Sequence, residues 1–223
     1  HPSRKRLNIL DKSKIENNLI KNKINIIIHC AALARVKECE KNKKKAYKTN
    51  ILGTKNVASS VANCFKKKNL NIKLVFMSSD GVYPSTKGNY KESDKLKPYN
   101  YYGLTKLEGE KIVKKLNDFI IIRTRFFDKN NIKFKYAATN IFTSSIEVNK
   151  LSLYIYKIIK KKFKGVINVG GKKVSDYKKY KKYKKNIKPC DKTVIFNSTN
   201  VKLASDASLN LKKFNRLIWN TPR

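Results

Sequence analysis

The chain alternates short apolar runs with longer segments in which apolar residues recur at helical spacing. Continuous β-branched runs such as NIIIHCAA (25–32) are typical of parallel strands buried on both faces. Strands are predicted over 25–32, 73–79, 119–127 and 165–171. Helices are predicted over 13–21, with Asp11 as N-cap, and over 44–66, 101–116, 148–161 and 175–185. This alternation specifies an α/β fold with a doubly wound parallel sheet and excludes a sandwich or a helical bundle.

The strong positive charge does not identify a partner. The 53 basic residues against 15 acidic ones give a net charge of +38, and all but seven of the basic residues are lysine. Lys, Asn and Ile are encoded by A/T-rich codons, so genome composition is a sufficient cause, whereas a phosphate-binding surface usually carries more Arg. Even YKKYKKY (177–183), the segment most similar to a nucleic-acid site, fits a surface helix with packed tyrosines and solvated lysines. We therefore expect no specific nucleic-acid partner.

The remaining composition favours a cytoplasmic protein of one domain, or one domain with a small lobe. The four cysteines lack the short paired spacing of metal sites, so reduced thiols and no metal are expected. No apolar stretch of membrane-spanning length and no signal-peptide layout is found, so no membrane partner is expected.

The segment YYGLTKLEGE (101–110) carries the clearest chemical signal. Tyr102 and Lys106 are four residues apart, so on a helix they lie on the same face. An ammonium group beside a phenol stabilises the phenolate and is expected to bring the Tyr102 pKa toward neutrality. Such a pair predicts general acid/base chemistry on an alcohol or carbonyl.

Small and polar residues follow the predicted strands at their carboxyl ends. They are Cys30-Ala31-Ala32, Ser78-Ser79-Asp80 and the segment 123–127. In doubly wound sheets, ligands bind outside this edge. The edge is therefore where a cofactor is expected.

Taken together, these motifs resemble the extended short-chain dehydrogenase/reductase superfamily, and most closely the dTDP-4-dehydrorhamnose reductase group of nucleotide-sugar reductases. The matching segments occur in the family's order between about residues 7 and 209. They are LNILDKSKI, INIIIHCAALARVKECE, TNILGTKNVA, SSDGVYP, YKESDKLKPYNYYGLTKLEGE, IIIRTRFF, IFTSSIEV and SDASLNL. One YxxxK motif is common by chance, but this ordered series is not.

The resemblance implies specific roles for the residues that match. Tyr102 is the expected acid/base, Lys106 its partner and a ligand of the nicotinamide ribose, and Ser79 the residue that orients the substrate oxygen. The other residues expected to bind the cofactor, which is NAD or NADP, are Cys30, Ala31, Ala32, Asn50, Ser78 and Arg123. The residues expected to bind the substrate, a nucleotide sugar, are Ser79, Asp80, Val82 and Phe126. Arg4 and Arg6 hint at NADPH.

The resemblance also implies a Rossmann-like doubly wound sheet, a small C-terminal substrate lobe and a possible homodimer. Residues 1–127 and 140–171 would form the NAD(P)-binding domain, and residues 128–139 and 172–223 the lobe. The family's glycine-rich turn is missing, because no glycine of this chain lies between a first strand and its helix. We therefore expect the first strand-helix-strand unit to be absent. The start at His1 favours a piece of a longer gene, and the alternative is a short homologue.

Other departures keep the function open at this stage. Arg125-Phe126-Phe127 stands where the reductases have Ser-Trp-Val, and the linker before Ile141 is shorter than the family's insert. Phe126 could stack on a base or sugar, and Arg125 could meet a diphosphate. The leading prediction is an NAD(P)-dependent reductase of a nucleotide-activated 4-keto sugar, for polysaccharide synthesis. The alternatives are an epimerase or dehydratase of the same superfamily and a non-catalytic regulatory subunit with this fold.

Overall fold

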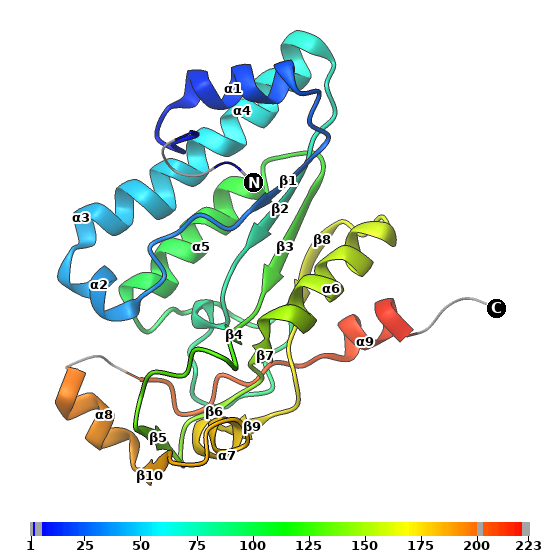
Figure 1. Cartoon of the computed structure of the whole chain (residues 1–223). Coiled ribbons are helices and arrows are strands. Elements are labelled where there is room, and N and C mark those ends of the chain that lie inside the picture. Colours follow the sequence, from blue (N-terminus) through cyan, green and yellow to red (C-terminus); the bar gives the residue numbers. More distant parts are fainter. Residues whose placement is uncertain (1, 3–5, 200–202, 220–223) are drawn as a thin grey trace.

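A computed structural model describes residue 2, residues 6–199 and residues 203–219. Its centre is a four-stranded parallel sheet in the order β1-β2-β3-β8 (Figure 1). The strands are β1 (Ile26–His29), β2 (Lys73–Met77), β3 (Phe119–Arg123) and β8 (Gly165–Asn168). Each lies within one of the four apolar runs, so the predicted Rossmann-like parallel sheet is confirmed.

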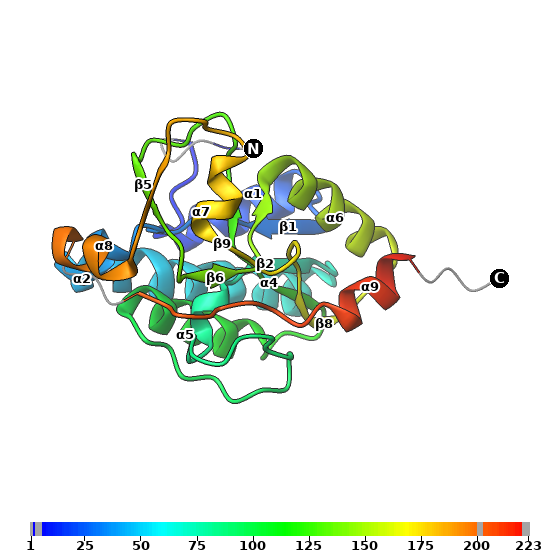
Figure 2. The same cartoon turned by 90° about the horizontal axis from the view of Figure 1, so that it is seen from below.

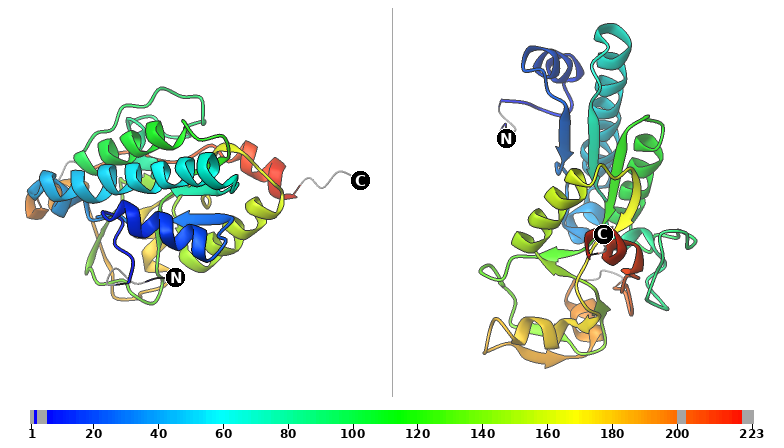
Figure 3. Two further views of the ribbon diagram at one scale, coloured as in Figure 1. Left: turned by 90° about the horizontal axis from the view of Figure 1, so that it is seen from above. Right: turned by 90° about the vertical axis from the view of Figure 1, so that its right-hand side faces the viewer.

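Helices cover both faces of this sheet, as Figure 3 shows from two further directions. On one face α1 (Lys12–Lys21), α4 (Gly53–Lys68) and α5 (Tyr101–Val113) bury the side chains of Leu74, Phe76 and Ile121. On the other face α6 (Val148–Lys160) and α9 (Lys212–Trp219) pack over Val75, Ile120 and Ile167. Successive side chains along each strand therefore pack into two separate cores, one on each face of the sheet.

Strand β1 lies at the edge of the sheet and is not buried on both faces as predicted. Its parallel register sets Ile28 beside Val75, so Ile28 points to the face that α6 and α9 cover. Those two helices do not reach β1, and Ile26 and Ile28 remain 40% and 47% exposed. His29, on the other face, is buried.

The helix predicted over 44–66 forms in three consecutive segments. These are α3 (Lys43–Ala46), a π-helical turn, η1 (Tyr47–Leu52), and α4. The wider turn carries the buried side chain of Asn50. π-Helical turns are rare, and those that occur are often at functional sites. The periodicity of the sequence did not predict this turn.

The run 119–127 is also interrupted. The chain leaves β3 after Arg123 and continues as β4 (Phe126–Phe127), which pairs with β7 (Ile146–Glu147).

The lobe follows below the carboxyl edge of the sheet (Figures 1 and 2). Its elements are the pair β5 (Tyr136–Ala138) and β10 (Lys188–Cys190), the pair β6 (Phe142–Thr143) and β9 (Val174–Ser175), and the helices α7 (Asp176–Lys181) and α8 (Lys192–Thr199). The short helix α2 (Val36–Lys41) follows β1, and the 3-10 turn η2 (Asp80–Val82) follows β2.

The expected division of the chain into two domains stays a prediction, with one correction. That division places all of residues 172–223 in the lobe, but α9 belongs to the core of the sheet. Phe214 and Ile218 pack there with Ile155 and Ile158 of α6. The amphipathic character of α9 explains this, because its apolar face needs a larger apolar surface to cover it.

A buried ion pair joins α5 to the sheet. Arg123, at the end of β3, binds Glu110 with two hydrogen bonds, from Nε to Oε1 at 2.9 Å and from Nη2 to Oε2 at 2.7 Å. Ser78 Oγ donates to the same carboxylate at 2.6 Å, and Arg123 Nη1 donates to the Tyr83 hydroxyl at 2.8 Å. The Tyr83 hydroxyl in turn donates to Asn168 Oδ1 at 2.9 Å. Helix α5 is thus tied to three strand ends by one satisfied network.

Two glycines let α5 approach the strand ends closely. A Cβ atom on Gly103 would lie 2.2 Å from the Gly81 carbonyl oxygen, and one on Gly109 would lie 2.5 Å from the Phe76 ring. Neither position has room for a side chain. The helix start therefore lies directly against η2.

The network predicts a large difference between two glutamates of α5. Glu110→Ala leaves the buried Arg123 guanidinium without its counter-charge, which is expected to lower the free energy of unfolding by about 3–5 kcal/mol. The matched control is Glu108→Ala, because Glu108 forms a more exposed pair with Lys111, and its loss is expected to cost about 0–1 kcal/mol. Urea unfolding of both variants measures the difference. Equal, small effects would show that the buried pair does not hold α5.

Candidate functional site

The carboxyl edge of the sheet brings Ser79 and Tyr102 together. Ser79 follows β2, and its Oγ accepts a hydrogen bond from Gly81 N at 3.0 Å, which caps η2. Tyr102 lies in the first turn of α5, beside the Gly103–Gly81 contact. Its hydroxyl lies close enough to the Ser79 side chain for Ser79 to act on the Tyr102 pKa. The two hydroxyls that the sequence predicted to act together are therefore adjacent.

Lys106 lies one turn further along α5 and is only 4% exposed. Its Nζ atom lies 4.6 Å from the centre of the Phe76 ring. Within the described part of the chain, no carboxylate forms an ion pair with it. Burial lowers the pKa of Lys106 to about 8, and nearby Cys30 and Glu110 oppose part of this shift. This amine is available for a ligand at the sheet edge.

The pKa of Tyr102 is raised to about 12, so the expectation of a lowered value was wrong. Burial of the phenol is the main cause, and the Asp80 carboxylate adds to it. The Ser79 hydroxyl and the charge of Arg125 act in the opposite direction, and Lys106 is not among the groups that shift this pKa. The spacing predicted that Tyr102 and Lys106 lie on one face of a helix. It did not show that the Asp80 carboxylate, in the turn η2 after β2, would lie near Tyr102.

Asn50 holds the loop that follows β1. Its Oδ1 accepts from Leu33 N at 2.7 Å, and its Nδ2 donates to Leu33 O at 3.0 Å and to Thr105 Oγ1 at 2.9 Å. Asn50 thus links the loop to α5 and supports the site, without facing solvent.

The small residues at the end of β1 lie at the surface of the site. Cys30 and Ala31 are exposed, and Ala32 is half-buried. Cys30 and Lys106 lie close enough that each affects the pKa of the other. His29, just before them, shares a hydrogen bond of 3.0 Å with Thr54, and burial lowers the pKa of this imidazole to about 3.

Three predicted ligand residues are not directed at the site. The side chains of Ser78 and Arg123 are bound to Glu110, so their geometry supports a role in holding α5 and not a contact with a cofactor. The side chain of Val82 is fully buried in an apolar cluster with Tyr83 and Leu209. Strand-end position alone cannot show which of these side chains turn inward.

The other two predicted substrate residues differ from each other. Phe126 is 54% exposed and open to a ligand. Asp80 is buried, and its carboxylate forms an ion pair with Arg125, with 2.7 Å between Nε and Oδ2. The sequence contained a signal for this pair, because acidic and basic residues follow neighbouring parallel strands.

Sequence reasoning also missed Lys179 of α7. Its tyrosine neighbour Tyr180 packs on Phe127 and Phe134 as the predicted stripe requires. Lys179, however, is buried, and its Nζ donates to Asp176 Oδ1 at 2.7 Å and to Thr143 Oγ1 at 2.9 Å. Uniform repetition of YKK conceals which lysine turns inward.

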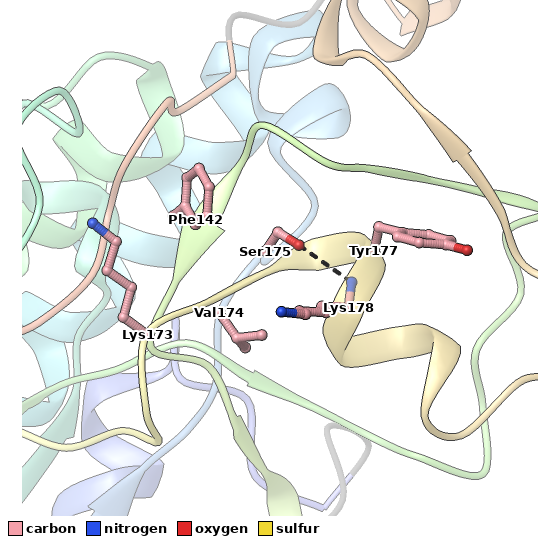
Figure 4. Close-up of a pocket in the computed structure, with 6 residues that line it drawn as sticks. All are labelled: Phe142, Lys173, Val174, Ser175, Tyr177 and Lys178. Atoms are coloured by element: carbon pink, nitrogen blue, oxygen red, sulfur yellow. Dashed lines mark hydrogen bonds between the residues drawn. The ribbon is translucent and has the colours of Figure 1, made fainter.

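A pocket of about 600 Å³ lies apart from these residues, in the lobe. Figure 4 shows its lining, which is Phe142, Lys173, Val174, Ser175, Tyr177 and Lys178. Ser175 Oγ accepts from Lys178 N, and Lys173 pairs with Asp206. None of the predicted catalytic residues lines it.

Among residues 6–199 and 203–219, no group of three or more His, Cys, Asp or Glu side chains could hold a metal ion. None of the helices described is long and apolar enough to cross a membrane.

Curated relatives match about half of the chain. The methionine adenosyltransferase 2 subunit beta of Bos taurus is 33% identical over 112 residues, which are 50% of this chain and 32% of that protein. A dTDP-4-dehydrorhamnose reductase of Aggregatibacter actinomycetemcomitans is 32% identical over 120 residues, which are 53% of this chain and 39% of the relative. The matched segments thus span about a third of the length of these relatives.

Solved structures match over nearly the whole chain. A dTDP-4-dehydrorhamnose reductase from Bacillus anthracis in complex with NADP has a TM-score of 0.83 at 26% identity, and the match covers 96% of this chain and 82% of that one. A hypothetical dTDP-4-dehydrorhamnose reductase from Sulfolobus tokodaii has a TM-score of 0.80 at 29% identity, covering 97% and 81%.

The family model described as "RmlD substrate binding domain" matches residues 1–144, well over half of the chain. The sheet, the order of the motifs and the neighbouring structures agree with this match. The chain therefore belongs to the RmlD substrate binding domain family, in agreement with the predicted resemblance to dTDP-4-dehydrorhamnose reductases of the extended short-chain dehydrogenase/reductase superfamily.

Proposed function

We propose that this protein reduces the keto group of a nucleotide-activated 4-keto sugar with NADPH or NADH. The observation that carries the proposal is the placement of Ser79, Tyr102 and Lys106 around one point of the sheet's carboxyl edge. Two neighbouring hydroxyls, with a buried amine one helical turn away, suit proton transfer to a carbonyl oxygen.

The residues at this edge fit a nicotinamide cofactor. The exposed small side chains Cys30 and Ala31 leave room for a ribose, and the Lys106 amine is free of a carboxylate partner among the described residues. Lys106 and Tyr102 would hold the ribose through hydrogen bonds, with Asn50 fixing the loop below. When bound, the reduced cofactor supplies a hydride to the sugar's keto carbon.

The protein's own groups then handle the charge on the oxygen. As the carbonyl oxygen becomes an alkoxide, Tyr102 donates its hydroxyl proton to it, and Ser79 stabilises it by a hydrogen bond. The products are the alcohol and a tyrosinate, which regains its proton from solvent. Phe126, exposed in β4 after the end of β3, would pack on the base or sugar of the substrate.

The epimerase or dehydratase alternative would use the same site. Burial and the Asp80 carboxylate raise the pKa of Tyr102 to about 12, so its hydroxyl is protonated at neutral pH, which is the form that donates a proton in a reduction. An epimerase or dehydratase begins by oxidising the sugar and uses the same tyrosine as a base. Reduction is the leading proposal because proteins named dTDP-4-dehydrorhamnose reductase match this chain at 26% and 32% identity.

The finer assignments rest on the relatives. The Bacillus anthracis reductase was solved with NADP, which supports NADPH. Of the two arginines that hinted at NADPH, Arg4 lies outside the described residues. A cytoplasmic location, a role in polysaccharide synthesis, a homodimer and the absence of a specific nucleic-acid partner remain predictions.

A second candidate has its own support. Several relatives, with 29–35% identity, are named methionine adenosyltransferase 2 subunit beta, a name that denotes one subunit of a larger enzyme. In this reading the protein binds a catalytic subunit and reduces nothing. Co-elution with a methionine adenosyltransferase in size-exclusion chromatography, without any turnover of a keto sugar, would favour it.

Tyr102→Phe tests the proposed chemistry. Removal of the general acid is expected to lower kcat by about 10²–10⁴-fold, while NADPH binding weakens only by the loss of one ribose hydrogen bond, about 0.5–1.5 kcal/mol. The measurement is NADPH oxidation with dTDP-4-dehydrorhamnose, followed by absorbance. Tyr101→Phe is the matched control, because Tyr101 precedes Tyr102 on the same helix and is expected to keep the wild-type rate.

Two outcomes would contradict the proposal. Wild-type protein that oxidises no NADPH with this or another nucleotide-activated keto sugar is not the proposed reductase. Wild-type turnover in Tyr102→Phe removes Tyr102 from the mechanism and with it the assignment of this site.

The burial of the Lys106 amine implies a pH dependence of stability. Its pKa is about 8 in the folded protein against an ordinary value of 10.5. Between these values the unfolded chain binds the proton and the folded protein does not, so this group adds stability as pH rises. Lys106→Met lacks the titration and serves as the reference.

Urea unfolding of both proteins at several pH values measures this contribution. The stability of wild type relative to Lys106→Met is expected to increase between pH 8 and 10.5, by on the order of 3 kcal/mol. A difference that stays constant with pH would show that Lys106 keeps its ordinary pKa.

A further inference from the structure

A chain of polar contacts links Arg125 through Asp80 to Ser79, the residue beside the proposed proton donor. Arg125 Nε donates to Asp80 Oδ2 at 2.7 Å, and Ser79 Oγ donates to Asp80 Oδ1 at 3.2 Å. Tyr102 lies close enough to these three residues that Asp80, Ser79 and Arg125 all act on its pKa. Each oxygen of the Asp80 carboxylate therefore has one partner, with the cation on one side and the reacting hydroxyls on the other.

Because Asp80 is buried, its charge acts strongly on the neighbouring hydroxyls. Its carboxylate is 2% exposed, so water does little to screen it. An unpaired carboxylate there would oppose the negative charge that forms on the substrate oxygen during reduction. It would also compete for the Ser79 hydroxyl proton, because a carboxylate is a stronger acceptor than a carbonyl oxygen.

We propose that Arg125 is a positioning residue whose charge cancels that of the Asp80 carboxylate, which leaves the Ser79 hydroxyl free to turn to the substrate oxygen. The inference rests on the proposed reduction at Tyr102. It assigns Asp80 to the protein's own charge balance, in place of the substrate contact that the sequence predicted.

The surrounding charged groups identify Arg125 as the cation that balances the Asp80 carboxylate. The other charged and titratable groups that act on Asp80, Arg125 or Tyr102 are Cys39 of α2, Tyr99, and Asp176, Lys179 and Tyr180 of α7. Lys179 is already bound to Asp176. Arg125 alone among the described cations forms an ion pair with Asp80.

The arginine is also placed to hold this position firmly. Its side chain is 31% exposed and contacts the Tyr99 hydroxyl at 3.5 Å through Nη2, in addition to the ion pair. It lies between β3 and β4, where the chain leaves the central sheet. The interruption of the predicted strand 119–127 therefore coincides with the residue that balances Asp80.

The test compares four variants of the protein in the NADPH assay. Arg125→Gln leaves the Asp80 charge unbalanced and is expected to lower kcat on the order of 100-fold. Arg125→Lys keeps the cation and should retain most of the rate. The double variant Asp80→Asn/Arg125→Gln removes both charges and should recover most of the loss. Arg35→Gln is the control, because Arg35 forms only an exposed pair with Glu38.

Two readouts separate positioning from a merely structural role. The dissociation constant for NADPH, followed by its fluorescence, should be the same in Arg125→Gln and wild type. Rescue by the double variant should appear in kcat, with KM little changed. If Arg125→Gln does not fold, as detected by circular dichroism, the test uses Arg125→Lys and the double variant. The first keeps a cation beside Asp80 and the second has no charge at either position, so both should keep most of the wild-type kcat. A kcat about 100-fold lower in both would contradict the proposal.

Failure of this inference differs from failure of the proposed function. If Tyr102→Phe abolishes reduction while Arg125→Gln keeps the wild-type kcat, the role of Arg125 is wrong and the reductase assignment stands. If Arg125→Gln is slow and the double variant is equally slow, charge cancellation is also excluded. If wild type reduces no keto sugar, the proposed function itself fails.

Discussion

The site depends on the contact between α5 and the ends of β2 and β3. Glu110, buried in the last turn of the helix, is bound by Arg123 from β3 and by Ser78 from the end of β2. Gly103 and Gly109 remove the side chains that would otherwise hold the helix away. Tyr102 and Lys106 occupy the same helix, so their distance from Ser79 is set by this contact. A rigid scaffold of this kind is what proton transfer requires, since small displacements of reacting groups are costly.

Burial and charge also determine the protonation states of the groups that this scaffold holds. Burial determines the protonation of both central groups: it raises the pKa of Tyr102 to about 12 and lowers the pKa of Lys106 to about 8. The first keeps a proton ready for donation, and the second keeps an amine that a ligand can engage. The Asp80–Arg125 pair places two opposite charges beside them without adding net charge.

Most of the fold could be predicted from the sequence, because apolar runs and helical stripes report burial directly. The four strands of the sheet, the capped helix after Asp11 and helix α5 all lie where the pattern indicated. The apolar run of β1 does not itself show an edge position, since Ile26 and Ile28 look the same whether or not a neighbour covers them. The indication came from the expected absence of the first strand-helix-strand unit. The π-helical turn around Asn50 and the break after Arg123 arise from tertiary contacts that leave no periodic signal. The YxxxK pair was placed correctly, but the Tyr102 pKa depends on Asp80, which lies on another element.

The most direct test of the proposed reduction follows the hydride itself. Incubation of the protein with a 4-keto sugar nucleotide and NADPH deuterated at the transferable position, followed by mass spectrometry and NMR of the sugar, reports where the label goes. A reductase is expected to place one deuterium on the former keto carbon for each NADPH oxidised. A sugar product without deuterium, or no product at all, would contradict the assignment of Tyr102, Ser79 and Lys106 to carbonyl reduction.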